Sequence, residues 1–311
     1  MNMMKTSVEE LTRSLLDELW WQYLRRVSYA QTYSTLVTNK GGKVVNDHIA
    51  LRTLNTHTGE QPEGIEAIRH ILNYLEYKQV GKYKFKKKKL NAIHFEHPNR
   101  LFPKIFVSQL EVSELPDWAQ KMIKETVADT PYLLSDKSIE LLNVLKENRS
   151  LPKEAADLLI LELTGYFQRA WDIPSKEVVL KLNDVSQYAA WVLLHGNSVN
   201  HFSAFVNYQE VPEWPDIAST CKGLETAGVQ MKQDIEGIIG SKLQQTATQA
   251  VKEMVEVINQ EGEIEKIKWT YAYYELAQRG LVEENGEMKL FSGFLGEQAD
   301  HLFDMTRTRD N

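Results

Sequence analysis

Hydrophobic and polar residues repeat with two different periods along the chain, and the change of period separates predicted helices from predicted strands. Leu11 and Leu15 recur at helical spacing behind Ser7 and Glu10, which have the spacing of a capping box at the start of a helix. The sequence therefore predicts an amphipathic helix over about residues 8–28.

A strand is predicted over about residues 44–54, where the stretch NDHIALRTL alternates between two faces. Because successive side chains of a strand point to opposite faces, His48 and Arg52 share one face while Ile49 and Leu51 share the other. The apolar face is expected to pack on the core, so the strand is expected to be half-buried. The face with His48 and Arg52 would then point away from the core, and its surroundings would indicate its function.

The order strand, helix and further strands occurs twice, over about residues 40–112 and again over about 199–295. The segment between them, 113–195, has the period of helices. We therefore predict an α+β protein that forms one domain over residues 1–311. In this prediction two βαβββ-like halves build one curved mixed sheet, and the helices pack outside it.

Within the second half, the alternating stretch VNHFSAFVN predicts a strand over 199–207. Residues 243–258 have a helix-like composition but end in a period of two, so helix and strand both stay open. A single strand is predicted over 264–280, because this segment is rich in aromatic and β-branched residues. A hairpin turn at 284–286 and a short helix over 297–306 are predicted beyond it.

The composition is that of an ordinary globular protein, with 42% hydrophobic and 25% charged residues in a chain of 311. A net charge of −7 argues against a nucleic-acid or anionic-membrane partner, and no apolar run approaches the roughly 18 residues that span a bilayer. The only cysteine, Cys221, excludes an intramolecular disulfide and a cysteine-rich zinc site. Acidic residues stand where a signal peptide would be apolar, so a cytoplasmic location is expected.

Three side chains on separate predicted strands could form a metal site. His48, His201 and Glu275 each lie on an extended segment, and two imidazoles with one carboxylate can occupy one face of an octahedral ion. Three positions would then stay open, as in non-haem Fe(II) oxygenases. The spacing alone favours the ordinary alternative, in which each histidine is a hydrogen-bonded core residue and Glu275 pairs with Arg279 or a lysine.

Two further features have both a structural and a functional interpretation. His94 and Glu96 share a strand face and form a second candidate site, although Pro98 places them at the end of a strand. The basic run at 82–89 could contact a phosphate or a partner, but it is more typical of a solvated strand face that discourages edge pairing.

Five stretches occur in the order NDHIALRTL, KIFVSQLEV, VNHFSAFVN, LQQTATQA and YYELAQRG. In this order and over about residues 15–306 the chain resembles the 2-oxoadipate dioxygenase/decarboxylase family, which is similar to the vicinal oxygen chelate enzymes. The resemblance implies a curved mixed β-sheet of vicinal-oxygen-chelate type surrounded by helices. It also implies that His48, His201 and Glu275 bind Fe(2+), with Zn, Ni or Co able to replace iron during purification.

The same resemblance implies the substrate contacts. Arg52 matches the arginine that binds a substrate carboxylate, and Glu297 and Gln298 match a substrate-binding segment near the C-terminus. Four residues are further candidates to line the pocket: Ser203, Gln244, Gln245 and Tyr273. Glu297 is charged where the family usually has an apolar residue, so another 2-oxo acid is an alternative substrate.

The activity implied by the resemblance is the conversion of a 2-oxo diacid such as 2-oxoadipate, with O2, to a 2-hydroxy acid and CO2. The partners would be this small acid and O2. Two alternatives stay open at this point. The chain could be another metal-dependent vicinal-oxygen-chelate enzyme, such as an isomerase, a lyase or a ring-cleaving dioxygenase, or a non-catalytic protein that binds a small acid.

Overall fold

A seven-stranded mixed sheet forms the centre of the computed structural model, which describes residues 4–295. The strands of this sheet lie in the order β3-β4-β5-β2-β7-β11-β8. Their bounds are β2 (Asn46–Asn55), β3 (Lys78–Phe85), β4 (Leu90–Glu96), β5 (Lys104–Glu111), β7 (Val199–Phe205), β8 (Leu243–Ala247) and β11 (Glu275–Arg279). Three two-stranded pairs lie outside it: β1 (Lys5–Ser7) with β6 (Ser150–Pro152), β9 (Lys252–Ile258) with β10 (Ile264–Thr270), and β12 (Leu281–Glu284) with β13 (Glu287–Leu290).

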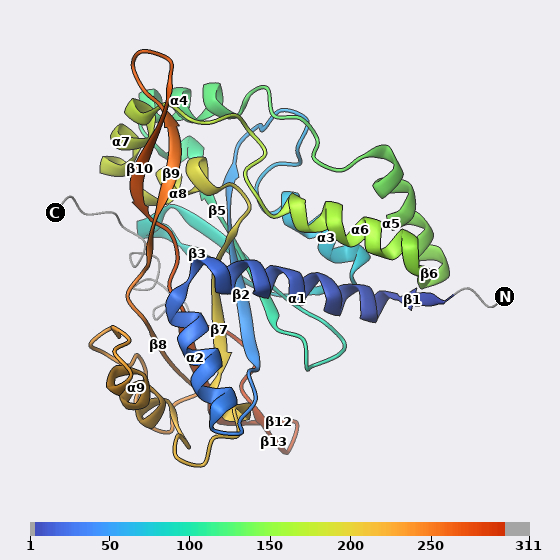
Figure 1. The fold of residues 1–311 in the computed structure, drawn as a ribbon, viewed down its shortest axis with the longest axis vertical. Coiled ribbons are helices and arrows are strands. Elements are labelled where there is room, and N and C mark those ends of the chain that lie inside the picture. The colour runs from blue at the N-terminus through green and yellow to red at the C-terminus, as the bar shows by residue number, and fades with distance from the viewer. Residues whose placement is uncertain (1–3, 296–311) are drawn as a thin grey trace.

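Helices surround the central strands (Figure 1). They are α1 (Val8–Arg26), α2 (Ser28–Asn39), α3 (Glu66–Tyr74), α4 (Asp117–Val127), α5 (Asp136–Asn148), α6 (Lys153–Tyr166), α7 (Lys176–Val185), α8 (Gln187–His195) and α9 (Ile217–Thr226). In the view of Figure 1, α3, α5 and α6 lie to the right of β2, and α9 lies at the lower left. None of the described helices is both long and apolar enough to cross a membrane.

The pairing of the strands brings three of them side by side at the centre of the sheet. β2 pairs with β7 in antiparallel orientation, and β7 pairs with β11 in parallel orientation. Ser203 on β7 lies opposite His48 on one side and opposite Glu275 on the other. The strand of His201 therefore lies directly between the strands of His48 and Glu275.

Several sequence predictions are confirmed. Helix α1 begins at the predicted capping box, in which the Ser7 hydroxyl accepts from the Glu10 amide and the Glu10 carboxylate accepts from the Ser7 amide. The hairpin turn between β12 and β13 has positive φ angles at Asn285 (55°) and Gly286 (80°), as a tight hairpin turn requires. The α+β class with a mixed sheet is also confirmed, whereas the division into two halves stays a prediction.

Other predictions need correction. Strand β2 is buried on both faces over residues 47–54, not half-buried, since helices and other segments cover both sides of this central strand. The open segment 243–258 forms two strands, β8 and β9. Helix α2 was not expected, and the predicted helix over 297–306 lies outside the described residues.

The single strand predicted over 264–280 is wrong, because residues 271–274 interrupt it and separate β10 from β11. At this interruption the chain leaves the pair with β9 and enters the main sheet. Side chains from two helices hold its backbone: the Trp191 indole donates to the Tyr271 carbonyl at 2.6 Å, and the Tyr23 hydroxyl donates to the Tyr273 carbonyl. Strand propensity could not predict hydrogen bonds supplied by distant helices.

We expect the hydrogen bond from Tyr23 to be important for stability, because it satisfies a buried carbonyl just before Glu275. Removal of the hydroxyl in Tyr23→Phe leaves the Tyr273 carbonyl unpaired, and should lower the free energy of unfolding by about 1–3 kcal/mol. Urea denaturation measures this change. The control is Tyr208→Phe, whose side chain is 50% exposed, and it should unfold like the wild type. An equal loss in both variants would contradict the role of Tyr23.

Candidate active site

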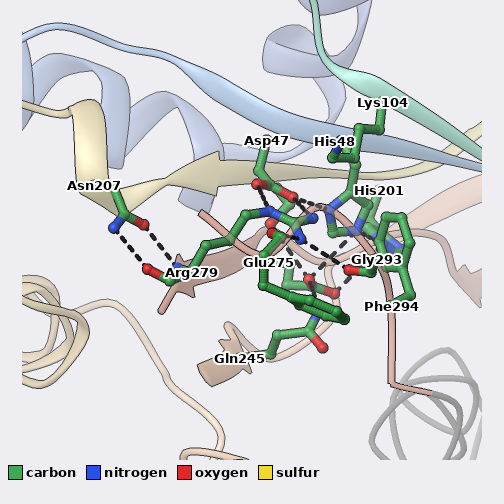
Figure 2. Close-up of polar contacts among 12 residues, drawn as sticks. Asp47, His48, Lys104, His201, Asn207, Gln245, Glu275, Arg279, Gly293 and Phe294 are labelled. Carbon is green, nitrogen blue, oxygen red and sulfur yellow. Dashed lines mark hydrogen bonds and ion pairs between the residues drawn. The ribbon is translucent and has the colours of Figure 1, made fainter. Parts of the chain in front are cut away.

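Two imidazoles and one carboxylate converge at a buried position on the central sheet (Figure 2). The Nε2 atoms of His48 and His201 lie 3.3 Å apart, and each lies 3.4 Å from a carboxylate oxygen of Glu275. All three side chains are buried. Among the described residues they are the one group of three His, Cys, Asp or Glu side chains whose ligand atoms lie within 4.8 Å of one another.

The partners of the other imidazole nitrogens determine which nitrogen carries the proton. His48 Nδ1 lies 2.8 Å from the Asp47 carboxylate, and His201 Nδ1 lies 3.2 Å from the side-chain oxygen of Asn200. Because both partners are acceptors, each neutral ring carries its hydrogen on Nδ1 and has a lone pair on Nε2. The two lone pairs then point toward each other and toward Glu275.

A local irregularity of the sheet places each of these acceptors beside its histidine. The register between β2 and β7 shifts between Asn46 and His48, so Asp47 is an extra residue, and a second shift leaves Asn200 as the extra residue on β7. At a β-bulge the side chain no longer follows strict alternation. Each histidine is therefore preceded by a bulged residue that binds its Nδ1–H.

Glu275 is fully buried, and only one of its carboxylate oxygens has hydrogen-bond donors. Its Oε1 accepts from Gln245 at 2.6 Å and from Ser203 at 3.3 Å, whereas Oε2 has no hydrogen-bond partner. Burial raises the pKa of Glu275, and the hydrogen bond from Gln245 partly opposes this shift. Burial, with the positive charge of Arg52, holds the pKa of His201 well below its ordinary value.

These residues fit a divalent transition metal. Two imidazole lone pairs and a carboxylate oxygen without a donor face one another, and a cation between them would convert their repulsion into coordination. Neutral imidazoles whose Nδ1–H groups are bound by Asp47 and Asn200 are the form in which histidine ligates metals. The donor set could hold Fe(II), and also Zn, Ni or Co.

The three side chains line a small cavity with a volume of about 40 Å³. Arg52 lines it as well and is only 1% exposed, with its guanidinium 4.9 Å from the centre of the Tyr188 ring and 5.1 Å from that of Trp191. The apolar part of the wall consists of Ala50, Leu51, Phe106, Phe294 and Leu295. The predicted shared face of His48 and Arg52 thus faces one enclosed space.

The other predicted pocket residues do not all line the cavity. The Tyr273 ring lines the cavity and stacks on His201 with centroids 4.8 Å apart. Ser203 lies behind Glu275 and donates to it, outside the cavity wall. Gln244 does not line the cavity and donates to the Gly237 carbonyl, whereas Gln245 reaches Glu275. Only one of the two adjacent glutamines reaches Glu275, because neighbours on strand β8 point to opposite faces.

Two predictions concern residues elsewhere. Glu297 and Gln298 lie outside the described residues. The alternative site at His94 and Glu96 lacks a third ligand among the described residues, since Glu96 instead binds His94 at 3.3 Å and the Lys104 ammonium group at 2.5 Å.

Sequence reasoning missed the residues that support the ligands. Asp47 and Asn200 stand directly before the two histidines, and this repeated acceptor–histidine pair was the signal that could have found them. Arg279, which was considered a partner of Glu275, instead forms a buried ion pair with Asp47, with N–O distances of 2.5 and 2.8 Å.

Two curated proteins are similar to this chain. A chloroplastic 2-oxoadipate dioxygenase/decarboxylase from Arabidopsis thaliana is 24% identical over 65% of this chain, and the match covers 51% of that protein, about half its length. A chloroplastic/amyloplastic 2-oxoadipate dioxygenase/decarboxylase from Oryza sativa subsp. japonica is 24% identical over 94% of this chain and 78% of its own length.

Solved structures share the fold. A protein from Ralstonia eutropha JMP134 described as a member of the glyoxalase superfamily superposes with a TM-score of 0.84, at 24% identity over 93% of this chain and 87% of its own. Hydroxyglutarate synthase from Oryza sativa in complex with 2-oxoadipate superposes with a TM-score of 0.73, at 22% identity over 96% of this chain and 93% of its own. The predicted sheet of vicinal-oxygen-chelate type is therefore confirmed.

The family model described as 2-oxoadipate dioxygenase/decarboxylase matches residues 16–310. This range includes every strand of the central sheet and all three candidate metal ligands. By this match, the chain belongs to the 2-oxoadipate dioxygenase/decarboxylase family.

Proposed function

We propose that this protein is an Fe(II)-dependent dioxygenase/decarboxylase. It converts a 2-oxo diacid such as 2-oxoadipate, with O2, to the 2-hydroxy acid one carbon shorter and CO2. The observation that carries this proposal is the convergence of His48, His201 and Glu275 in a closed cavity that a buried arginine, Arg52, also lines. Family membership supports the reaction class, and the 2-oxoadipate bound to the rice synthase supports the substrate class.

In this proposal His48, His201 and Glu275 would hold the metal. Two neutral imidazoles and one carboxylate would supply three ligands, the set that non-haem Fe(II) oxygenases use. Bound Fe(II) supplies the one-electron chemistry that O2 requires. The hydrogen bonds from the imidazoles to Asp47 and Asn200 fix the ring orientations, and Gln245 orients the carboxylate of Glu275.

Arg52 binds the carboxylate at the far end of the substrate. It lies four residues beyond His48 on the same strand, about 13 Å along the backbone, and its long side chain can lean back over part of that span. Its planar guanidinium presents parallel N–H groups that match the two oxygens of a carboxylate. A diacid can then bind the metal with its 2-oxo acid end and Arg52 with the other end.

The buried charges of the site also favour a dianion. Two carboxylates, Asp47 and Glu275, stand against two guanidiniums, Arg52 and Arg279, and all four groups are buried. These charges cancel, so a divalent metal leaves an excess of two positive charges in a medium that screens them weakly. A substrate with two carboxylates removes this excess, whereas a monocarboxylate leaves one charge unbalanced.

The atoms and electrons of the reaction balance without a second oxo acid. The substrate and O2 together contain the same atoms as the 2-hydroxy acid and CO2. Oxidation of the substrate itself supplies the electrons that reduce O2. The apolar wall around Phe106 and Phe294 limits the access of bulk water, which protects the reaction from side reactions.

The activity is tested with the purified protein, Fe(II) and 2-oxoadipate in a closed cell. We expect one O2 consumed and one CO2 released for each 2-oxoadipate, with 2-hydroxyglutarate as the product and no need for another oxo acid. An oxygen electrode, CO2 detection and mass spectrometry of the product measure these quantities. Isomerisation or cleavage of the acid without O2 uptake would contradict the proposal.

The metal assignment is tested by single substitutions. The variants His48→Ala, His201→Ala and Glu275→Ala each remove one of three ligands, so anaerobic loading with Fe(II) should give far less than one iron per chain. The matched control is His94→Ala, which removes the alternative site and should keep the wild-type iron content. Elemental analysis gives the result, and retained iron in the first three variants would refute the assignment.

Arg52→Met tests the carboxylate clamp with two substrates of equal chain length. The kcat/KM for 2-oxoadipate should fall by about 10–100-fold, which corresponds to the roughly 1.5–3 kcal/mol of a charge-assisted hydrogen bond. For 2-oxohexanoate, which has a methyl group in place of the distal carboxylate, kcat/KM should change little. An equal fall for both acids would mean that Arg52 does not bind the distal carboxylate.

A further inference from the structure

Arg279 connects two parts of the site that are far apart in the sequence. On one side its Nε and terminal nitrogen donate to the Asp47 carboxylate at 2.5 and 2.8 Å (Figure 2). On the other side its second terminal nitrogen donates to the carbonyls of Phe291 and Gly293, both at 2.8 Å. Residues 291–295, which we name the closing segment, are thus tied to the residue that orients His48.

The position of Arg279 is itself restrained. It lies on β11 four residues after Glu275, and its side chain is buried. The side chain of Asn207 accepts from the Arg279 backbone amide at 2.7 Å and donates to its carbonyl at 2.9 Å. With its backbone held from both sides and its guanidinium held by four acceptor contacts, Arg279 has little freedom to adopt another rotamer.

Asp47 transmits the position of Arg279 to His48. One of its carboxylate oxygens binds both the Arg279 guanidinium and His48 Nδ1. Burial alone would raise the pKa of Asp47, but the charge of Arg279 and the hydrogen bonds from His48 and Arg279 hold it well below its ordinary value. A buried carboxylate of this kind depends on its cationic partner, so displacement of Arg279 would also disturb the contact with His48.

The closing segment forms part of the cavity wall. The Phe294 ring packs edge-on against His48 with centroids 4.9 Å apart and contacts Phe106 at 5.0 Å. Its backbone amide donates to the Tyr83 hydroxyl at 3.3 Å. A cavity of about 40 Å³ has room for about three waters and not for a six-carbon diacid. Substrate binding therefore requires part of the wall to move, and Phe294 and Leu295 lie beyond the last described strand.

We infer that Arg279 is a positioning residue that couples closure of the cavity by residues 291–295 to the orientation of the metal ligand His48. This inference rests on the proposed role of His48 as a ligand. A metal ion bound at Nε2 would hold the His48 ring with its Nδ1–H toward Asp47. Asp47 would in turn hold the Arg279 guanidinium against the carbonyls of the closing segment. Because such coupling is reciprocal, closure strengthens metal binding as metal binding strengthens closure.

Hydrogen exchange with and without Co2+ tests the coupling without any measurement of activity. In the wild-type protein, Co2+ should slow amide exchange in the closing segment. In Arg279→Lys, which keeps the charge but loses the planar fork, this effect of Co2+ should disappear. The same variant should bind Co2+ about 10–100-fold more weakly, as is typical when a residue behind a metal ligand is lost.

Two more variants complete the experiment. Asp47→Asn keeps the size of the side chain and an acceptor for His48, and it should also lose the effect of Co2+ on exchange; it serves if Arg279→Lys fails to fold. Lys242→Met is the matched control, because the Lys242 ammonium group lies 5.9 Å from the centre of the Phe291 ring and has no contact with Asp47 among the described residues. This control should keep the wild-type response and affinity.

The outcomes distinguish the inference from the function on which it rests. If the wild-type protein does not bind Co2+, the proposed metal site is wrong. If it binds Co2+ but Arg279→Lys and Asp47→Asn keep both the wild-type affinity and the effect of Co2+ on exchange, the coupling alone is wrong. A purely structural role would speed exchange equally with and without Co2+ and leave the affinity unchanged, which would also overturn the inference.

Discussion

Lone pairs of two imidazoles and one carboxylate point at one another inside this protein, and their mutual repulsion explains why each of these side chains is held by hydrogen bonds from behind. The Nε2 atoms of His48 and His201 and the unpaired oxygen of Glu275 meet in a buried space. A divalent cation would relieve this repulsion, so the free energy of metal binding would also contribute to the stability of the folded chain. The supporting hydrogen bonds keep these atoms in place and prevent the rings from turning away.

The topology of the sheet makes this convergence achievable. β2 and β7 pair antiparallel at the centre, and β11 adds to β7 in parallel, so three adjacent strands each contribute one ligand. Adjacent strands lie about 4.8 Å apart, which is close enough for side chains on one face to reach a common ion. Two bulges then place Asp47 and Asn200 beside the histidines. The same sheet therefore supplies both the ligands and their supports.

The buried charges of the site bear on the proposed binding of both the metal and the substrate. Arg52 and Arg279 offset Glu275 and Asp47 before any metal binds, so the charge of a divalent ion is left for the substrate to neutralise. The two arginines have different tasks in this arrangement. Arg52 lines the cavity, whereas the Arg279 guanidinium donates hydrogen bonds to Asp47 and to the backbone of the closing segment. Family membership supports the proposed class of reaction, and these buried charges support the proposal that the substrate is a diacid.

Helix α1, strand β2 and the shared face of His48 and Arg52 could be predicted from local patterns alone, because they depend on capping residues and on periodicity. The resemblance carried by five short stretches pointed to His48, His201 and Glu275 as candidate ligands, which periodicity alone could not separate from ordinary core residues. Contacts between distant segments were needed to show that the strand over 264–280 is interrupted, that Gln245 and not Gln244 reaches Glu275, and that Arg279 binds Asp47. Each of these depends on a bulge, a register or a distant helix, and such contacts arise between segments whose pairing no local pattern specifies.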